Sequence, residues 1–192
     1  MTARRPKVRT QEADTGLGRA AVRIFAANER MNQMILEQLD PAAWNAKPPG
    51  KARSIAAIFT HMHNVRTKWV RLTAQHLRVP RQLKRGHCTP KQARAGLAES
   101  AASCENMLAA AFSGGGGSRI KKFVRDGWAC PWPVGPEMLC YMISHEAHHR
   151  GQVMMLAHQL GFPLPQKVMY GIWNWEKIWK ECGAPRGPGY SI

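Results

Sequence analysis

The feature that most constrains this chain is a pair of histidines, His145 and His149, four residues apart in a run of helical period. On a helix these two imidazoles lie one turn apart on the same face, so both can reach one metal ion. The same face continues at spacings of three and four residues, as in a helix that packs into a bundle. Its other members are Met138, Met142, Gln152 and Leu156. An inward imidazole costs free energy unless it is bonded, so the alternatives are a shared metal and separately hydrogen-bonded core histidines. The spacing favours the metal.

A third histidine lies on a second segment of helical period, residues 54–78. An apolar stripe recurs there every three or four residues and includes His61. His63 is about 200° further round the same helix, so we expect it at the surface or in a second layer. The stripe consists of Ile58, His61, Val65, Trp69 and Leu72. His61 is therefore the better candidate to complete a site with His145 and His149.

The spacing of apolar residues, together with the positions of proline, glycine and capping residues, predicts five helices and no strands. Ser54 and Thr89 suit helix N-caps, and Pro136 suits a first helical turn. The expected helices span residues 17–39, 54–78, 90–112, 136–160 and 168–180. Residues 119–135 are expected to form an ordered crossover. We therefore predict an all-α fold, with a four-helix bundle over residues 17–161. A disordered basic arm, residues 1–16, is expected before it. A tryptophan-rich extension, residues 162–192, is expected to pack on the bundle or on a partner.

The chain is strongly basic, with 28 Lys and Arg, 12 Asp and Glu, and a formal net charge of +16. Such a field attracts anions. The basic clusters do not alternate with aromatic residues, so a solvated surface is favoured over nucleic-acid binding. The sequence contains neither a bilayer-spanning apolar segment nor a Cys-x-x-Cys pair, which indicates a cytoplasmic protein with reduced thiols and no membrane partner. The glycine run at 113–118 lacks the ending of a phosphate-binding loop and is expected to be a linker.

Three imidazoles on two helices would make a catalytic type of metal site. Three protein ligands leave a position open for water or substrate. Because the ligands are neutral, the charge of the ion stays largely uncompensated, which favours deprotonation of a bound water or thiol. Imidazole suits zinc, nickel, copper and iron. We expect a divalent ion, with zinc or nickel preferred.

Two blocks of the sequence resemble the DinB/YfiT-like superfamily of metal-binding four-helix bundles. The first runs from Ser54 to His61 and is followed by Val65-Arg66 and Trp69; the second runs from His145 to Gln152. The resemblance spans residues 17–161. It implies an up-down-down-up bundle, a divalent metal on the three histidines, and frequent homodimers. It also implies a metal-dependent enzyme, such as a thiol-dependent S-transferase, an isomerase or a hydrolase, although many members have no known activity.

Such an enzyme is expected to activate a thiol or water at the metal and to bind a small anionic substrate through cations. Arg66 and Arg150 are the first candidates for that role. The letters from His145 to His149 also fit the zinc-protease pattern His-Glu-x-x-His, with Glu146 as general base. A metzincin histidine and an upstream strand are both missing from the pattern, so the protease is the weaker alternative. A non-enzymatic metal-binding stress or interaction protein is the other alternative.

The C-terminal extension carries Trp173, Trp175 and Trp179, and the whole chain has seven tryptophans. So much large apolar surface needs more cover than one small bundle core offers. We therefore expect a homodimer.

Overall fold

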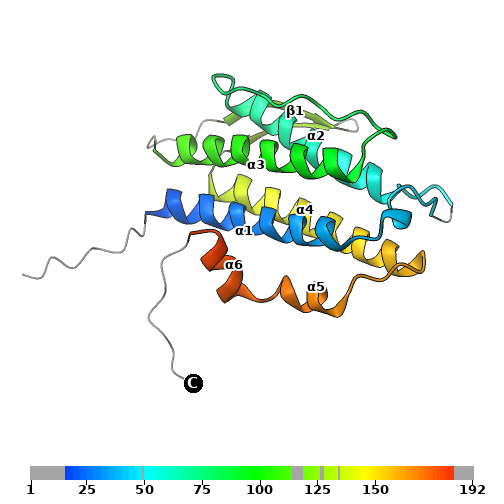
Figure 1. Cartoon of the computed structure of the whole chain (residues 1–192). Coiled ribbons are helices and arrows are strands. Elements are labelled where there is room, and N and C mark those ends of the chain that lie inside the picture. Colours follow the sequence, from blue (N-terminus) through cyan, green and yellow to red (C-terminus); the bar gives the residue numbers. More distant parts are fainter. Residues whose placement is uncertain (1–15, 49, 114–118, 126–127, 134, 184–192) are drawn as a thin grey trace, which may run out of the picture.

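The computed structural model describes residues 16–183 except 49, 114–118, 126–127 and 134. Within these residues the chain is mainly helical, which agrees with the predicted all-α class (Figure 1). The elements are α1 (Leu17–Gln38), the 3-10 turn η1 (Pro41–Ala43), α2 (Ile55–Thr73), α3 (Pro90–Ser113), β1 (Arg119–Arg125), β2 (Trp128–Pro133), α4 (Pro136–Gln159), α5 (Gln166–Gly171) and α6 (Trp175–Glu181). The expected basic arm, apart from Gly16, and the glycines of the expected linker lie outside the described residues.

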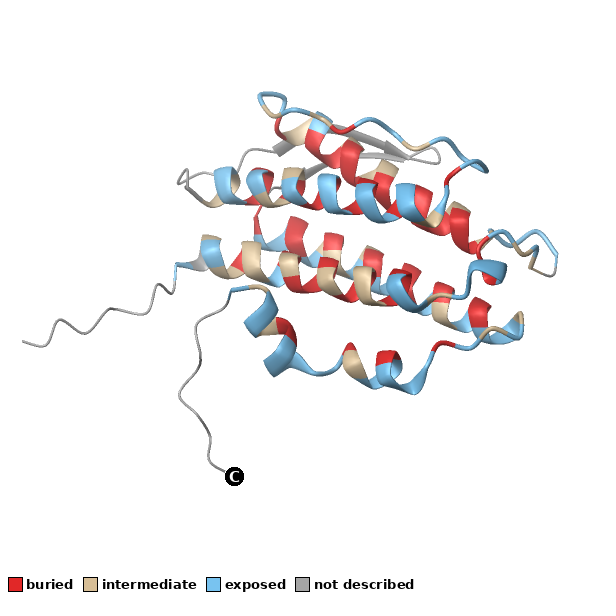
Figure 2. Cartoon of the chain, in the orientation of Figure 1, coloured by how far each residue is buried: buried red, intermediate tan, exposed pale blue. Residues whose placement is uncertain are grey.

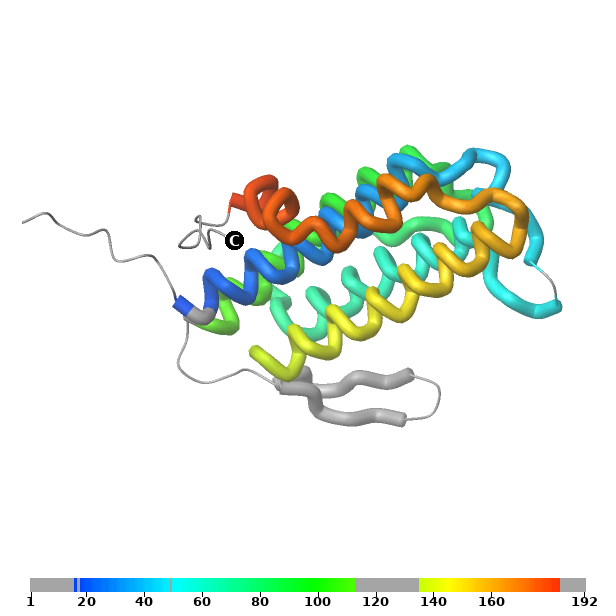
Figure 3. Tube along the Cα trace, turned by 90° about the horizontal axis from the view of Figure 1, so that it is seen from below, coloured from blue at the N-terminus to red at the C-terminus, as the bar shows by residue number. Residues whose placement is uncertain are grey.

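The four long helices pack side by side. Helix α1 contacts α3 and α4, and α2 contacts the same two helices. In Figure 1, α1 and α4 run in one direction along the bundle and α2 and α3 run in the other. The short helices α5 and α6 lie against α1 (Figure 3).

The helix starts follow the predicted capping residues. The hydroxyl of Ser54 accepts a hydrogen bond from the backbone N–H of Ala57 at 3.2 Å. At the start of α3, Thr89 and Gln92 bond to each other's backbone N–H groups, as in a capping box. Each cap satisfies a donor that the first helical turn leaves without a partner.

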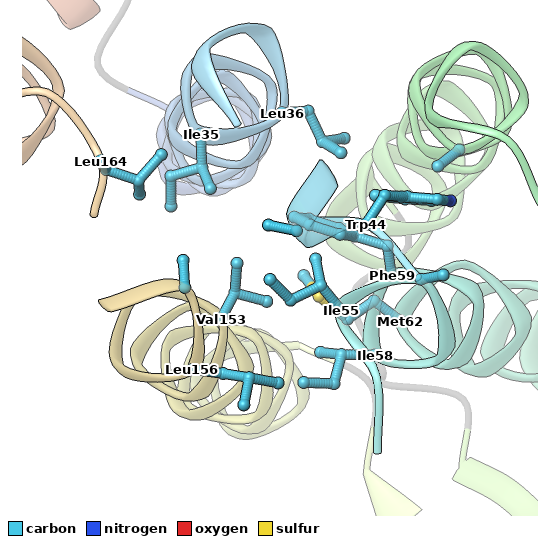
Figure 4. Packing of buried hydrophobic residues seen from close by; sticks show 14 of the residues in the cluster. Ile35, Leu36, Trp44, Ile55, Ile58, Phe59, Met62, Val153, Leu156 and Leu164 are labelled. Atoms are coloured by element: carbon cyan, nitrogen blue, oxygen red, sulfur yellow. The ribbon is translucent and has the colours of Figure 1, made fainter. Parts of the chain in front are cut away.

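A polar layer divides the core into two apolar clusters. One cluster lies at the end where α1 and α4 begin, and includes Phe25, Trp69 and Met142. The other lies at the opposite end; Figure 4 shows Ile35 and Val153, which two different helices contribute to it. Between them lie buried polar or charged side chains, and Figure 2 shows the buried faces of the helices turned toward one another. The polar members of this layer are Asn28, Glu29, Asn32, Arg66, Ser100, Glu146 and Arg150.

Helix α2 ends at Thr73, earlier than the expected residue 78. The chain then runs back along α2 to the start of α3. The side-chain amide of Asn64 bonds to both the N–H and the carbonyl of Leu83, at 2.9 and 3.0 Å. Gly96 of α3 allows this close approach, because a Cβ there would lie 3.0 Å from Leu83 and 3.2 Å from His63. These contacts hold the connection against α2 and α3.

The expectation of no strands is wrong for residues 119–133. Strands β1 and β2 pair antiparallel, with Arg125 opposite Trp128. The sequence places Asp126-Gly127 between these two partners, a dipeptide that favours two-residue hairpins. That signal was available in the sequence.

The single C-terminal helix expected over residues 168–180 is also wrong, since α5 and α6 are separate. The side chain of Asn174 accepts a hydrogen bond from the N–H of Lys177 at 3.1 Å. Asn174 therefore caps a new helix in the middle of the predicted one.

Candidate metal centre

The structure brings His61, His145 and His149 together between α2 and α4. Their ligand atoms all lie within 4.8 Å of one another. The Nε2 atoms of His61 and His145 are 3.3 Å apart. Two nitrogens each about 2.1 Å from one tetrahedral ion would be about 3.4 Å apart, so this spacing suits a shared zinc-like ion. The donor set therefore fits a divalent metal.

His149 is held in one orientation by a residue of its own helix. Its Nδ1 lies 2.7 Å from Oε1 of Gln152, three residues further along α4. An amide oxygen only accepts, so the proton is on Nδ1 and Nε2 is the nitrogen that can bind a metal. Gln152 is thus a polar partner of a candidate ligand, a role that sequence periodicity alone did not assign.

Aromatic rings flank the candidate site on the side of His145. The ring of Tyr141 stacks near His145 with centroids 6.1 Å apart, and Trp69 lies edge-on to His145 at 5.4 Å. The hairpin adjoins both ligand-bearing helices, because β1 packs against α2 and β2 packs against α4. The rings of Trp69 and Tyr141 therefore border the site on one side.

Arg66 and Glu146, two of the candidate catalytic residues, bind each other in the core. The guanidinium donates two hydrogen bonds of 2.6 Å to the carboxylate. Both side chains are 0% exposed. Arg66 also pairs with Glu29 of α1 at 2.7 Å. Glu146 further accepts hydrogen bonds from Asn28 and Asn32 at 2.6 and 2.7 Å.

The charges of this network are mutually satisfied. Burial alone would raise the pKa of Glu146, but the charge and hydrogen bonds of Arg66 and the two asparagine amides hold that pKa below its usual range. Burial would lower the pKa of Arg66, but the carboxylates of Glu146 and Glu29 raise it. Both groups therefore stay ionised in the core.

Arg150 belongs to the same layer. It donates hydrogen bonds to the side-chain oxygens of Asn28 and Asn32, at 2.5 and 3.1 Å, and is buried. Burial lowers the pKa of its guanidinium. All three candidate catalytic residues thus contact α1 or the core of the bundle, and their polar ends bond to protein groups.

His63 is turned away from the candidate site, as its position round the helix predicts. It is fully buried rather than at the surface. Its ring nitrogens lie 2.8 Å from the carbonyl oxygen of Gly96 and 2.9 Å from that of Arg81. His63 therefore joins α2 to α3 and to the connection between them.

None of the helices that the structure describes is long and apolar enough to span a membrane.

The sequence matches the family model of the DinB family over residues 14–181. Neither a curated protein nor a solved structure matches it. The matched range contains all three clustered histidines and the four long helices, and it covers most of the sequence. The chain therefore belongs to the DinB family.

Proposed function

We propose that the protein is a metal-dependent enzyme that holds one divalent ion, zinc or nickel, on His61, His145 and His149. The observation that carries the proposal is the convergence of three imidazoles from two helices within 4.8 Å. The order and direction of the long helices support an up-down-down-up bundle of the DinB type. Such a site is set between helices, where bundle proteins place their metals.

The proposed reaction class is thiol-dependent S-transfer, isomerisation or hydrolysis of a small anionic substrate. An ion held by three neutral imidazoles would supply a lowered pKa to a water or thiol bound at an open position. Within the chain, Gln152 orients His149, and the rings of Tyr141 and Trp69 border the site. The net charge of +16 favours the approach of acidic substrates.

Arg66 and Arg150 are better suited to holding the helices than to touching a substrate. Their side chains are buried and bonded to Glu146, Asn28 and Asn32. We therefore propose that they fix the position of α4 relative to α1 and α2. Glu146 shares these bonds, which argues against its use as the general base of a protease.

Elemental analysis of the purified protein tests the metal. We expect about one divalent ion per chain, and loss of most of it in His61→Ala, His145→Ala and His149→Ala. His148→Ala is the matched control, because His148 adjoins His149 on the same helix and is exposed. Full metal content in all three ligand variants would refute the site.

A panel of low-molecular-weight thiols with electrophilic or maleyl-type acids tests the reaction. We expect metal-dependent turnover that His145→Ala abolishes. Metal-dependent peptide cleavage that requires Glu146 would favour the protease instead. A bound metal without turnover of either kind would favour a non-enzymatic metal-binding protein.

A further inference from the structure

One long segment of the chain carries only positive charge. Between Asp40 and Glu99 the sequence has no Asp or Glu and has twelve Lys and Arg. Six of these cations form what we call the basic strip, at the end of α2, on the connection to α3 and at the start of α3. They are Arg71, Arg78, Arg81, Lys84, Arg85 and Lys91, and all six are exposed.

The basic strip lacks local neutralisation. Across the described ranges, none of its six side chains has a carboxylate within ion-pair distance. Arg94, one turn further along α3, differs because it pairs with Glu37 at 3.0 Å. The strip therefore presents uncompensated charge to solvent.

The strip is held in a fixed course along the bundle. The carbonyl of Arg81 lies 2.9 Å from His63, and Leu83 is bonded through both its N–H and its carbonyl to Asn64. Further along, Trp44 donates a 2.6 Å hydrogen bond to the carbonyl of Cys88. The connection therefore runs from the middle of α2 back toward the start of that helix. A helix of 19 residues, the length of α2, spans about 28 Å.

The apolar side chains of the connection point into the protein. Leu77 and Val79 pack against one core cluster and Leu83 packs against the other. The exposed positions beside them are occupied by the cations. A site that binds a membrane surface would combine its cations with exposed apolar side chains. Leu77, Val79 and Leu83 do not serve as such anchors, because they pack against the core. The charges are also spread along the chain rather than gathered in a pocket for one small anion.

We propose that the basic strip binds the phosphate backbone of double-stranded nucleic acid without reading its sequence. A duplex carries one negative charge per about 1.7 Å of its axis, so a strip along most of the length of α2 faces enough phosphates for all six cations. Phosphate contacts position a protein on a duplex but carry no base information. The sequence alone favours a solvated basic surface; the fixed course of the strip and its inward apolar side chains are what the structure adds.

The test uses the full-length protein and a fluorescent 20-base-pair DNA duplex of random sequence, titrated at several salt concentrations. In the strip variant, Arg81→Gln, Lys84→Gln and Arg85→Gln are combined, which leaves the backbone bonds of the connection in place. The matched control combines Lys51→Gln, Lys167→Gln and Lys180→Gln, three exposed cations outside the strip. Both variants have the same net charge. A difference between them in duplex affinity therefore comes from the strip and not from the overall charge of the protein.

We expect the strip variant to bind the duplex at least about tenfold more weakly than the native protein. The slope of log Kd against log salt concentration should fall by about 3. The control variant should keep its affinity for the duplex within about twofold of the native value and should keep the native slope. Equal losses in the two variants, or binding by neither the native chain nor the control, would overturn the proposal. Binding to phosphatidylserine vesicles but not to the duplex would overturn it as well. Loss of the histidine metal leaves this result unaffected, so the proposal stands or falls independently of the enzymatic one.

Discussion

One hydrogen bond joins the side-chain amide of Gln152 to His149, a candidate metal ligand. The amide accepts from Nδ1 of His149 at 2.7 Å and brings no charge. A carboxylate in the same place would make the imidazole more basic and partly neutralise the ion. We expect Gln152→Glu to tighten metal binding about tenfold and Gln152→Leu to weaken it about tenfold. Competition with a chromogenic chelator measures both.

Gln159→Glu is the control for that pair of variants. It adds the same charge to the same helix at an exposed position two turns further on. It should leave the metal dissociation constant within about twofold. If Gln159→Glu tightened binding as much as Gln152→Glu, the effect would belong to the general field and not to the hydrogen bond.

The Arg66–Glu146 pair makes the stability of the fold depend on the buried carboxylate of Glu146 staying ionised. Glu146→Gln keeps the shape of the side chain but leaves the buried guanidinium without its closest counter-charge. Removing one partner of a buried pair costs about 3–5 kcal/mol. We expect a loss of that size in the free energy of unfolding, measured by urea denaturation at pH 7. Glu99→Gln, on the exposed face of α3, should cost less than about 0.5 kcal/mol. A loss below about 1 kcal/mol in Glu146→Gln would contradict the importance of the pair.

Sequence periodicity is sufficient to predict which histidines lie together, but it does not predict the buried ion pairs beside them. His145 and His149 share a face by spacing alone, and His61 lies on an apolar stripe. The sequence makes Arg66 a candidate to bind an anionic substrate. Its actual partner, Glu146, is 80 residues away, so spacing does not identify the pair. Long-range pairs of this kind follow from helix order and depth in the bundle, which one sequence does not reveal.

Among the elements, α2 illustrates how a connection can bury a second side of a helix. The stripe through His61 and Val65 is predicted to point inward. Its members Ile58 and Trp69 are buried as predicted, but His61 and Val65 are only partly buried. Phe59 and His63, on another side, are fully buried. The reason is the connection after α2, which covers that side together with α3. A segment with no helical or strand period gives no sign of where it will pack.

An ion pair joins the C-terminal end of helix α6 to α1. Nε of Arg30 donates to Glu181 at 2.5 Å. The hydrogen bond and charge of Arg30 hold the pKa of Glu181 below its usual range. Since the folded-state pKa is the lower one, the pair stabilises α6 above the unfolded pKa of about 4.3, and this stabilisation is lost as the pH falls through the folded value.

We expect Glu181→Gln to speed amide hydrogen exchange in α6 by about two- to fivefold at pH 7, the modest effect of a partly exposed pair. Mass spectrometry of the peptide containing Trp175 to Glu181 measures it. Glu176→Gln changes the same helix at an exposed carboxylate with no ion pair in the described structure and should leave exchange unchanged. Equal exchange in native protein and Glu181→Gln would show that the apolar contacts of Ile178 hold α6 alone.

At the scale of the whole molecule, the bundle leaves large apolar side chains in solvent on α4 and α5 and just after α5. Met155 is 59% exposed, Tyr170 is 72% exposed and Trp173 is 70% exposed. Met155 and Met169 also line an open apolar groove between α4 and α5. The core of one chain leaves this surface in solvent, and exposed apolar patches of this kind mark interaction sites. We therefore keep the homodimer as a prediction.

Sedimentation velocity at micromolar concentration tests this prediction. We expect the native chain to sediment as a dimer and a Tyr170→Ser, Trp173→Ser double variant to sediment as a monomer, because both substitutions remove exposed apolar area from the surface that a partner would cover. Neither side chain is buried within its own chain, so the variant should unfold at nearly the native temperature. Ile24→Ser, an exposed apolar side chain of α1 that is 40% exposed, should leave the dimer intact. A native monomer, or a dimer that survives the double variant, would show that α5 and the residues after it are not the interface.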